Sequence, residues 1–277
     1  MNLLIEPFTY SFMQNALIIA MLISVPSALL SCFLVLRGWS LMGDAVSHAV
    51  LPGIVLAYVA GWPLIIGAFA AGMACSLAAG FVQENSRVKQ DTVLGVIMSG
   101  MFGLGIVMMT QITTDLHLDH VLFGNILGTG QQQILTAGGI GLAVALTLLL
   151  KWRDFAMFSF DPVQARVVGL QVRWLHYGLL AMISVMVVAM LSSVGIILSV
   201  ALLIAPGAIA FLIQPRILSR MLAAAVAITL AASVFGIWAS FWLDSAPAPT
   251  VVLVLTAMFI AVFALRQLQA ARRAAAA

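Results

Sequence analysis

The stretch NALIIAMLISVPSALLSCFLVL at residues 15–36 contains no charged side chain, and Arg37 follows it directly. A helix needs about 20 consecutive apolar residues to cross the hydrocarbon core of a bilayer. Eight further apolar runs follow along the chain, at residues 43–60, 63–82, 92–112, 132–150, 175–193, 195–213, 221–243 and 251–265. The sequence therefore predicts an all-α, polytopic helical membrane protein with about nine transmembrane helices.

The overall composition excludes a soluble globular domain. Hydrophobic residues make up 64% of the chain and charged residues only 8%, whereas soluble domains carry about 25% charged residues. A membrane β-barrel is disfavoured, because barrel strands alternate in hydrophobicity over roughly ten residues and the runs here are continuous. Two breaks between spans are short, AGWP at 60–63 and SSVG at 192–195. Eight spans is therefore the alternative to nine.

The distribution of positive charge supports nine spans and sets an orientation. Lys and Arg are enriched in cytoplasmic loops of membrane proteins. We expect the N-terminus outside and the C-terminus inside, because all twelve basic residues follow odd-numbered spans: Arg37; Arg87 and Lys89; Lys151, Arg153, Arg166 and Arg173; Arg216 and Arg220; Arg266, Arg272 and Arg273. This asymmetry also accounts for the net charge of +3, so no nucleic-acid partner is expected.

The chain has no room for a second, soluble domain. Residues 1–277 are expected to form a single transmembrane domain, with the longest polar connection, a cytoplasmic segment, at 151–174. The sequence contains no GxxxxGK[ST] loop for ATP, no HExxH and no GxSxG, which are motifs of nucleotide-binding and hydrolytic sites. We therefore expect a transport subunit and not an enzyme, with membrane lipid as its solvent.

Asp44 and His48 are the residues that best fit a functional site. They are four residues apart in a predicted span, so they share one helix face. At 1.5 Å per residue, His48 lies roughly 16 Å beyond the level of Arg37, near the middle of a core about 30 Å thick. A structural Asp–His bond between helices is one interpretation. A site for a divalent cation is favoured, because ionisable groups inside a membrane are usually functional and both groups bind Mn, Fe and Zn.

Pro52 and Gly53 follow this pair and predict a break in the helix. Proline removes one helical hydrogen bond and leaves the carbonyl of His48 without its donor. Broken helices near the bilayer midplane often build ion sites. Two side chains do not complete a metal site, however, so a second copy facing the first is expected to supply two more ligands.

Two further segments carry candidate residues. DLHLDH at 115–120 places His117, Asp119 and His120 in the predicted outer loop, where they form either a metal-entry cluster or an ordinary solvated loop. In FDPVQARVVGL at 160–170, Asp161 is placed to cap a helix that begins at Pro162.

The helix after this cap is expected to present Ala165, Val168 and Gly169 as a small apolar face that ends in a glycine stop. It is interpreted either as a linker or as a docking helix for a cytoplasmic partner. Two glycine-rich stretches, GAFAAG at 67–72 and GMFGLG at 100–105, predict close helix packing.

Four ordered segments together resemble the permease subunits of manganese/zinc/iron ABC importers, and the chelated-iron/manganese branch in particular. The resemblance runs from near the N-terminus to about residue 265. The segments that carry it are GWSLMGDAVSHAVLPG (38–53), HLDHVLFGNILG (117–128), FDPVQARVVGL (160–170) and ILSVALLIAPGAIAFLI (197–213).

The resemblance implies a multi-pass protein of the bacterial cytoplasmic membrane and a set of partners. These are a second permease subunit, identical or related, a cytoplasmic ABC ATPase dimer and an extracytoplasmic metal-binding protein. It also implies that Asp44 and His48 contact the transported metal, that the segment from Asp161 to Gly169 engages the ATPase, and that no cofactor is bound permanently.

Two other transport functions remain as alternatives. A secondary metal transporter would use an ion gradient, and that class usually carries more intramembrane acids and inverted repeats. An ABC permease for an iron chelate, haem or cobalamin would move a bulky substrate and would not need an Asp–His pair. The sequence favours Mn or Fe as the cargo and keeps Zn as a third candidate.

Overall fold

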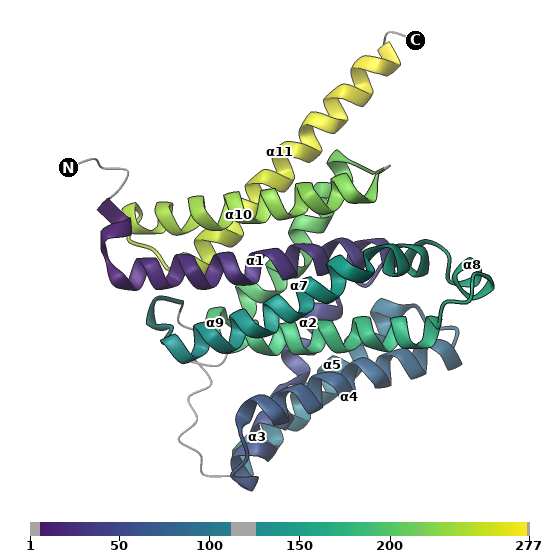
Figure 1. The fold of residues 1–277 in the computed structure, drawn as a ribbon. Coiled ribbons are helices and arrows are strands. Elements are labelled where there is room, and N and C mark those ends of the chain that lie inside the picture. The colour runs from purple at the N-terminus through teal and green to yellow at the C-terminus, as the bar shows by residue number, and fades with distance from the viewer. Residues whose placement is uncertain (1–5, 112–125, 216, 276–277) are drawn as a thin grey trace.

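The computed structural model describes residues 6–111, 126–215 and 217–275, and this part of the chain is helical and contains no strand. The fold class is therefore confirmed. The elements, shown in Figure 1, are η1 (Glu6–Thr9), α1 (Ser11–Arg37), α2 (Met42–Ala49), α3 (Leu51–Ala60), α4 (Leu64–Asn85), α5 (Gln90–Gln111), η2 (Ile126–Gly128), α7 (Gln131–Phe160), α8 (Pro162–Val167), α9 (Val172–Ile213), α10 (Leu218–Trp242) and α11 (Pro247–Ala275).

Eight stretches of helix in the described residues are long and apolar enough to cross a membrane, with α2 and α3 counted together as one. Eight and not nine are found because the predicted spans 175–193 and 195–213 are both contained in α9, which has 42 residues. At 1.5 Å per residue a straight helix of that length would measure about 63 Å, twice the hydrocarbon thickness. A single straight crossing is therefore ruled out.

Helix α9 reverses its direction at Gly195. This glycine has φ 81° and ψ 175°, which are not helical angles. Before it, the ring of His176 lies 5.2 Å from that of Trp39, just beyond the end of α1. After it, the backbone N–H of Gly207 donates to Ser31, again near the end of α1. Both halves of α9 thus return to one end of the bundle, as the green ribbon in Figure 1 shows, and together they match the two predicted spans.

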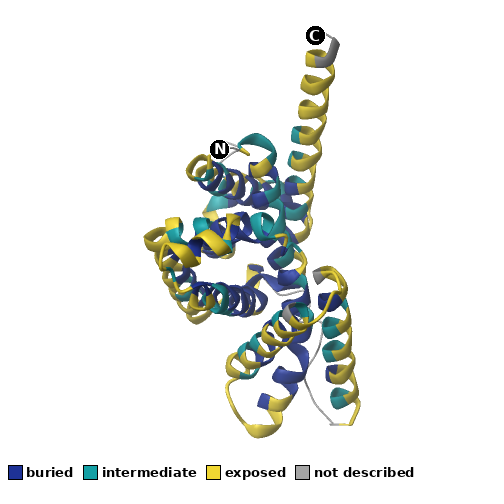
Figure 2. Cartoon of the chain, turned by 90° about the vertical axis from the view of Figure 1, so that its right-hand side faces the viewer, coloured by how far each residue is buried: buried dark blue, intermediate teal, exposed yellow. Residues whose placement is uncertain are grey.

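The core of the bundle surrounds α1, whose side chains are mostly buried. It packs against α7, α9 and α10, and small polar residues allow these helices to approach closely. Ser24 on α1 and Ser233 on α10 share a hydrogen bond of 2.9 Å. By contrast, α5 and α11 are largely exposed, and Figure 2 shows the C-terminal half of α11 extending from the bundle as an exposed helix. Lipid or partner subunits must cover these outer surfaces.

The predicted glycine packing is confirmed for one stretch and only partly for the other. Gly53 on α3 and Gly67 on α4 face each other so closely that a methyl group on either would overlap the backbone carbonyl of the other. In GMFGLG, a Cβ on Gly105 would lie 2.8 Å from Leu51, but Gly100 and Gly103 have nothing within 4 Å. The contact between α3 and α4 fixes the second half of the helix that carries Asp44 and His48.

Candidate functional site

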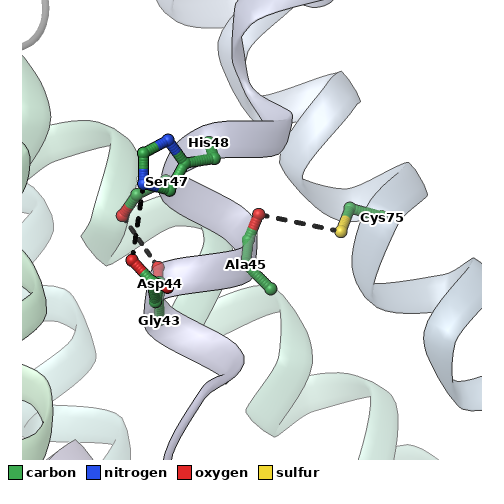
Figure 3. A network of polar contacts seen from close by, with 6 residues as sticks. All are labelled: Gly43, Asp44, Ala45, Ser47, His48 and Cys75. Carbon is green, nitrogen blue, oxygen red and sulfur yellow. Dashed lines mark hydrogen bonds and ion pairs between the residues drawn. The ribbon is translucent and has the colours of Figure 1, made fainter. Parts of the chain in front are cut away.

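Helix α2 carries Asp44 and His48 on the same face, as Figure 3 shows. The Nε2 atom of His48 lies 3.5 Å from Oδ1 of Asp44, and the two side chains keep 31% and 35% of their surface exposed, respectively. The prediction that Asp44 and His48 share one helix face is confirmed. Because 3.5 Å is long for a charge-assisted hydrogen bond, both groups retain most of their capacity to bind a further partner.

The helix break at Pro52 is smaller than the sequence suggested. Val50, which separates α2 from α3, keeps helical angles of φ −67° and ψ −26°. Hydrogen bonding resumes at once, since the N–H of Ile54 donates to Val50 O over 3.1 Å. Pro52 has no N–H for the carbonyl of His48, so the break amounts to this missing bond. Gly53 does not unwind the helix but provides the close contact with α4.

Apolar side chains surround His48 on the side away from Asp44. The ring of Phe102 on α5 meets the imidazole edge to face at 5.3 Å. A cavity of about 10 Å³ beside them is also lined by Leu191 and Ile196, which is room for a single water molecule. The hydroxyl of Ser47 donates to the carbonyl of Gly43 over 2.7 Å and therefore remains with its own helix.

Carboxylate and imidazole both belong to the side chains that bind divalent metals, and Asp44 and His48 offer one of each. Within the residues that the structure describes, no group of three or more His, Cys, Asp or Glu side chains is close enough to hold a metal ion. Cys75 on α4 is buried and donates weakly to the carbonyl of Ala45 over 3.9 Å. That one chain supplies only two side-chain ligands stays a prediction. The metal-entry candidates His117, Asp119 and His120 lie outside the described residues.

The segment at 151–174 contains the end of α7, the short helix α8 and the start of α9. The predicted cap of α8 is confirmed. Oδ1 of Asp161 accepts hydrogen bonds from the N–H groups of Val163 and Gln164 at 2.9 and 3.0 Å. Pro162 is the first residue of α8, the position where its missing N–H costs nothing. Gly169 adopts φ 90°, a left-handed angle that favours glycine, and ends this short helix as expected.

The residues of the predicted small apolar face of α8 do not share one environment. Ala165 is fully buried against the bundle, whereas Val168 is exposed. Val163 and Val167 are four residues apart and share the outward face, on which Val167 is 83% exposed. Ala165 lies between them in sequence and therefore on the opposite side of the helix. Val163, Val167 and Val168 are the apolar side chains that this segment exposes, beside the polar Gln164 and Arg166.

A pocket of about 710 Å³ next to α8 was missed in the sequence. It lies where α1 and α7 end and α9 begins, and Arg37, Arg166 and Arg173 line it together with Trp39, His176 and Tyr177. These arginines had been interpreted only as indicators of topology. The closeness of arginines to Trp and Tyr in the sequence was the one signal of such a pocket. The arginines come together only because three separate helix ends pack against one another.

Known proteins similar to this chain are membrane components of metal transport systems. The sequence is 50% identical to the chelated iron transport system membrane protein YfeD of Yersinia pestis, over 94% of this chain and 87% of that protein. It is 42% identical to the manganese transport system membrane protein MntC of Halalkalibacterium halodurans, over 92% of this chain and 87% of that protein.

A solved structure agrees with these relatives. The fold matches PsaBC from Streptococcus pneumoniae, determined in complex with Fab, with a TM-score of 0.83 and 34% identity over 94% of both chains. These similarities indicate a multi-pass protein of the bacterial inner membrane. The model of the ABC 3 transport family matches residues 9–266, and the chain belongs to this family.

Proposed function

We propose that this chain is the permease subunit of an ATP-driven importer and that it conducts Mn(II) or Fe(II), with Zn(II) as a third candidate cargo. Family membership and the iron and manganese systems of its relatives support this proposal. The observation that carries it within the molecule is the Asp44–His48 pair, which is placed in an apolar helix yet is about one-third exposed. A carboxylate at such a depth needs water, a cation or a charged partner.

A second permease subunit is the partner proposed to complete this site. Asp44 and His48 each keep free coordination capacity, and no third ligand approaches them within the described part of this chain. A facing pair from another permease would give two carboxylates and two imidazoles, and the carbonyl of His48 or water would add oxygen ligands for Mn(II) or Fe(II). Each subunit would supply half of the ligands of this shared site. The ion would be released when the two halves of the site move apart.

The energy for transport is proposed to come from separate ATPase subunits. The chain has no GxxxxGK[ST] loop of its own, so it is expected to have no ATPase activity alone. The capped helix α8, with Val163, Val167 and Val168 exposed, is the proposed contact. An extracytoplasmic binding protein is proposed to deliver the ion at the opposite end of the bundle, and no permanently bound cofactor is required.

Uptake of radioactive Mn(II) and Fe(II) by cells that express Asp44→Asn tests this function. The substitution removes the charge and keeps the shape, so we expect uptake to fall nearly to background while the melting temperature of the purified complex is unchanged. Asp91→Asn is the matched control, because Asp91 is an exposed acid in the first turn of α5. Normal uptake by Asp44→Asn would refute the metal path, and a parallel collapse in melting temperature would instead show a structural Asp–His bond.

A bulky iron chelate is a different substrate class that the same experiment separates. The close pairing of a carboxylate with an imidazole at Asp44 and His48 supports a bare ion, because both groups bind Mn, Fe and Zn directly and a haem or cobalamin would not need such a pair. If radioactive iron entered cells only as a chelate and did so equally in Asp44→Asn cells, the chelate alternative would replace the proposal. Uptake that requires an ion gradient but no ATPase would identify a secondary transporter.

A further inference from the structure

The arginine-lined pocket beside α8 is unrelated to the Asp44–His48 pair. Its lining includes Arg37, the last residue of α1, and Phe158, near the end of α7, so it lies at the end of the bundle next to α8. Figure 1 shows α8 at that end. Its volume of about 710 Å³ falls within the roughly 300–1,000 Å³ typical of small-molecule sites. The pocket is therefore large enough for a polar headgroup.

The charged side chains among the described residues that line this pocket are all arginines. Arg37, Arg166 and Arg173 line it, and no acidic residue does so among the described positions. None of these three arginines forms an ion pair with a carboxylate in that part of the chain. Asp161, which precedes the lining residue Pro162, uses Oδ1 to cap α8. Three guanidinium groups around one pocket form a site for an anion, most specifically for a phosphate group.

Arg37 is held in place by the pocket wall and not by a counter-ion. Its guanidinium lies 4.3 Å from the ring centre of Phe158 and 5.0 Å from that of Trp39. One Nη1–H donates to the carbonyl of Phe158 over 3.4 Å, while the buried Nε has no hydrogen-bond partner. The aromatic rings fix the position of the arginine at little cost to its charge, so the pocket is preorganised for an anion.

The pocket also has the composition of a membrane interface. Trp39, Trp174 and Tyr177 are among its lining residues, and Trp and Tyr concentrate at the level of the lipid headgroups. Trp174 is strongly exposed, as expected for a side chain that contacts lipid. In the proposed orientation with the C-terminus inside, this level belongs to the cytoplasmic leaflet, where basic pockets between helices bind anionic headgroups.

We propose that this pocket binds the phosphate of an anionic phospholipid from the cytoplasmic leaflet. The lipid would join residues from three elements, since Arg37 belongs to α1, Arg166 to α8 and Arg173 to α9. Helix α8 has only six residues and is bound to the bundle mainly through Ala165. A headgroup that bridges these arginines therefore fixes α8 relative to the transmembrane helices.

Native mass spectrometry of the full chain, purified from bilayers of phosphatidylglycerol and phosphatidylcholine, tests the proposal. We expect the chain to retain phosphatidylglycerol and the variant Arg37→Gln/Arg166→Gln/Arg173→Gln to lose it. The control, Arg266→Gln/Arg272→Gln/Arg273→Gln, removes the same charge from α11 and should retain the lipid. Each arginine near a membrane surface contributes about fivefold in affinity, so the pocket variant should bind roughly a hundredfold more weakly.

The other outcomes distinguish a lipid phosphate from a soluble phosphate, and a lipid site from a protein-docking surface. Competition by inorganic phosphate at equal strength would show a soluble-anion site and overturn the lipid assignment. Equal lipid retention by the pocket and control variants would overturn it as well. Unchanged retention with loss of a co-purifying ATPase would identify a protein-docking surface. If the triple variant does not fold, Arg173→Gln alone must lower retention about fivefold, because its side chain is exposed and not needed for packing. No readout here depends on metal uptake.

Discussion

Nε2 of His48 lies 3.5 Å from Oδ1 of Asp44, and both side chains remain about one-third exposed in the isolated chain. A structural ion pair inside a membrane would be expected to have shorter contacts and to be buried, because unpaired polar groups in that environment are costly. The geometry of the pair therefore fits two ligands whose bound cation is supplied during transport better than it fits a structural ion pair. In the proposed metal site, Asp44 would supply charge and His48 would supply preference among metals, so the two residues should contribute differently to transport.

We predict that His48→Ala reduces discrimination among divalent ions as well as the rate of uptake. Imidazole favours transition metals, whereas the remaining carboxylate also accepts Mg(II) and Ca(II). Uptake of Mn(II) should fall at least about tenfold, by analogy with losses of 10–100-fold when even the supports of a metal ligand are removed. Competition by excess Mg(II) in the uptake assay measures the change. Unaltered competition would show that His48 does not contact the ion.

We predict that Gly53→Ala destabilises the protein through the contact between α3 and α4. The added methyl would overlap the carbonyl of Gly67, and overpacking of this kind costs about 1–3 kcal/mol. Gly103→Ala is the control, because it adds the same methyl at a position on α5 with nothing within 4 Å. Thermal unfolding in detergent should separate the two variants. Equal melting temperatures would mean that the helices separate freely at this point.

We predict that Asp161→Ala loosens α8 and weakens the proposed coupling, whereas Asp161→Asn leaves both nearly intact. Alanine removes the acceptor for the N–H groups of Val163 and Gln164, at about 1 kcal/mol. Asparagine keeps that acceptor. Hydrogen exchange over residues 162–167 should accelerate in the alanine variant only, and ATP-dependent uptake should fall with it. Faster exchange with full uptake would reduce this segment to a linker.

The comparison of sequence and structure shows which features depend on neighbouring residues alone. Uninterrupted apolar length specified the spans, and Asp161 before Pro162 specified a cap, because both follow from local chemistry. The sequence indicated the reversal at Gly195 only as a short break between two spans, because a glycine in an apolar run does not reveal its φ angle. The burial of Ala165 was missed because the side of a six-residue helix that faces the bundle is set by tertiary packing. The arginine pocket was missed for the same reason.

Finally, we predict that the N-terminus lies outside and the C-terminus inside. Arg37 and Arg173 line one pocket at one end of the bundle, and a bilayer retains such positive ends on the cytoplasmic side. An alkaline phosphatase reporter, which is active only in the periplasm, should be silent when fused after Ala277. Fused after Asp244, at the opposite end of α10 from Leu218, the same reporter should be active. The reverse pattern would place the arginine pocket outside the cell and would also remove α8 from the reach of a cytoplasmic ATPase.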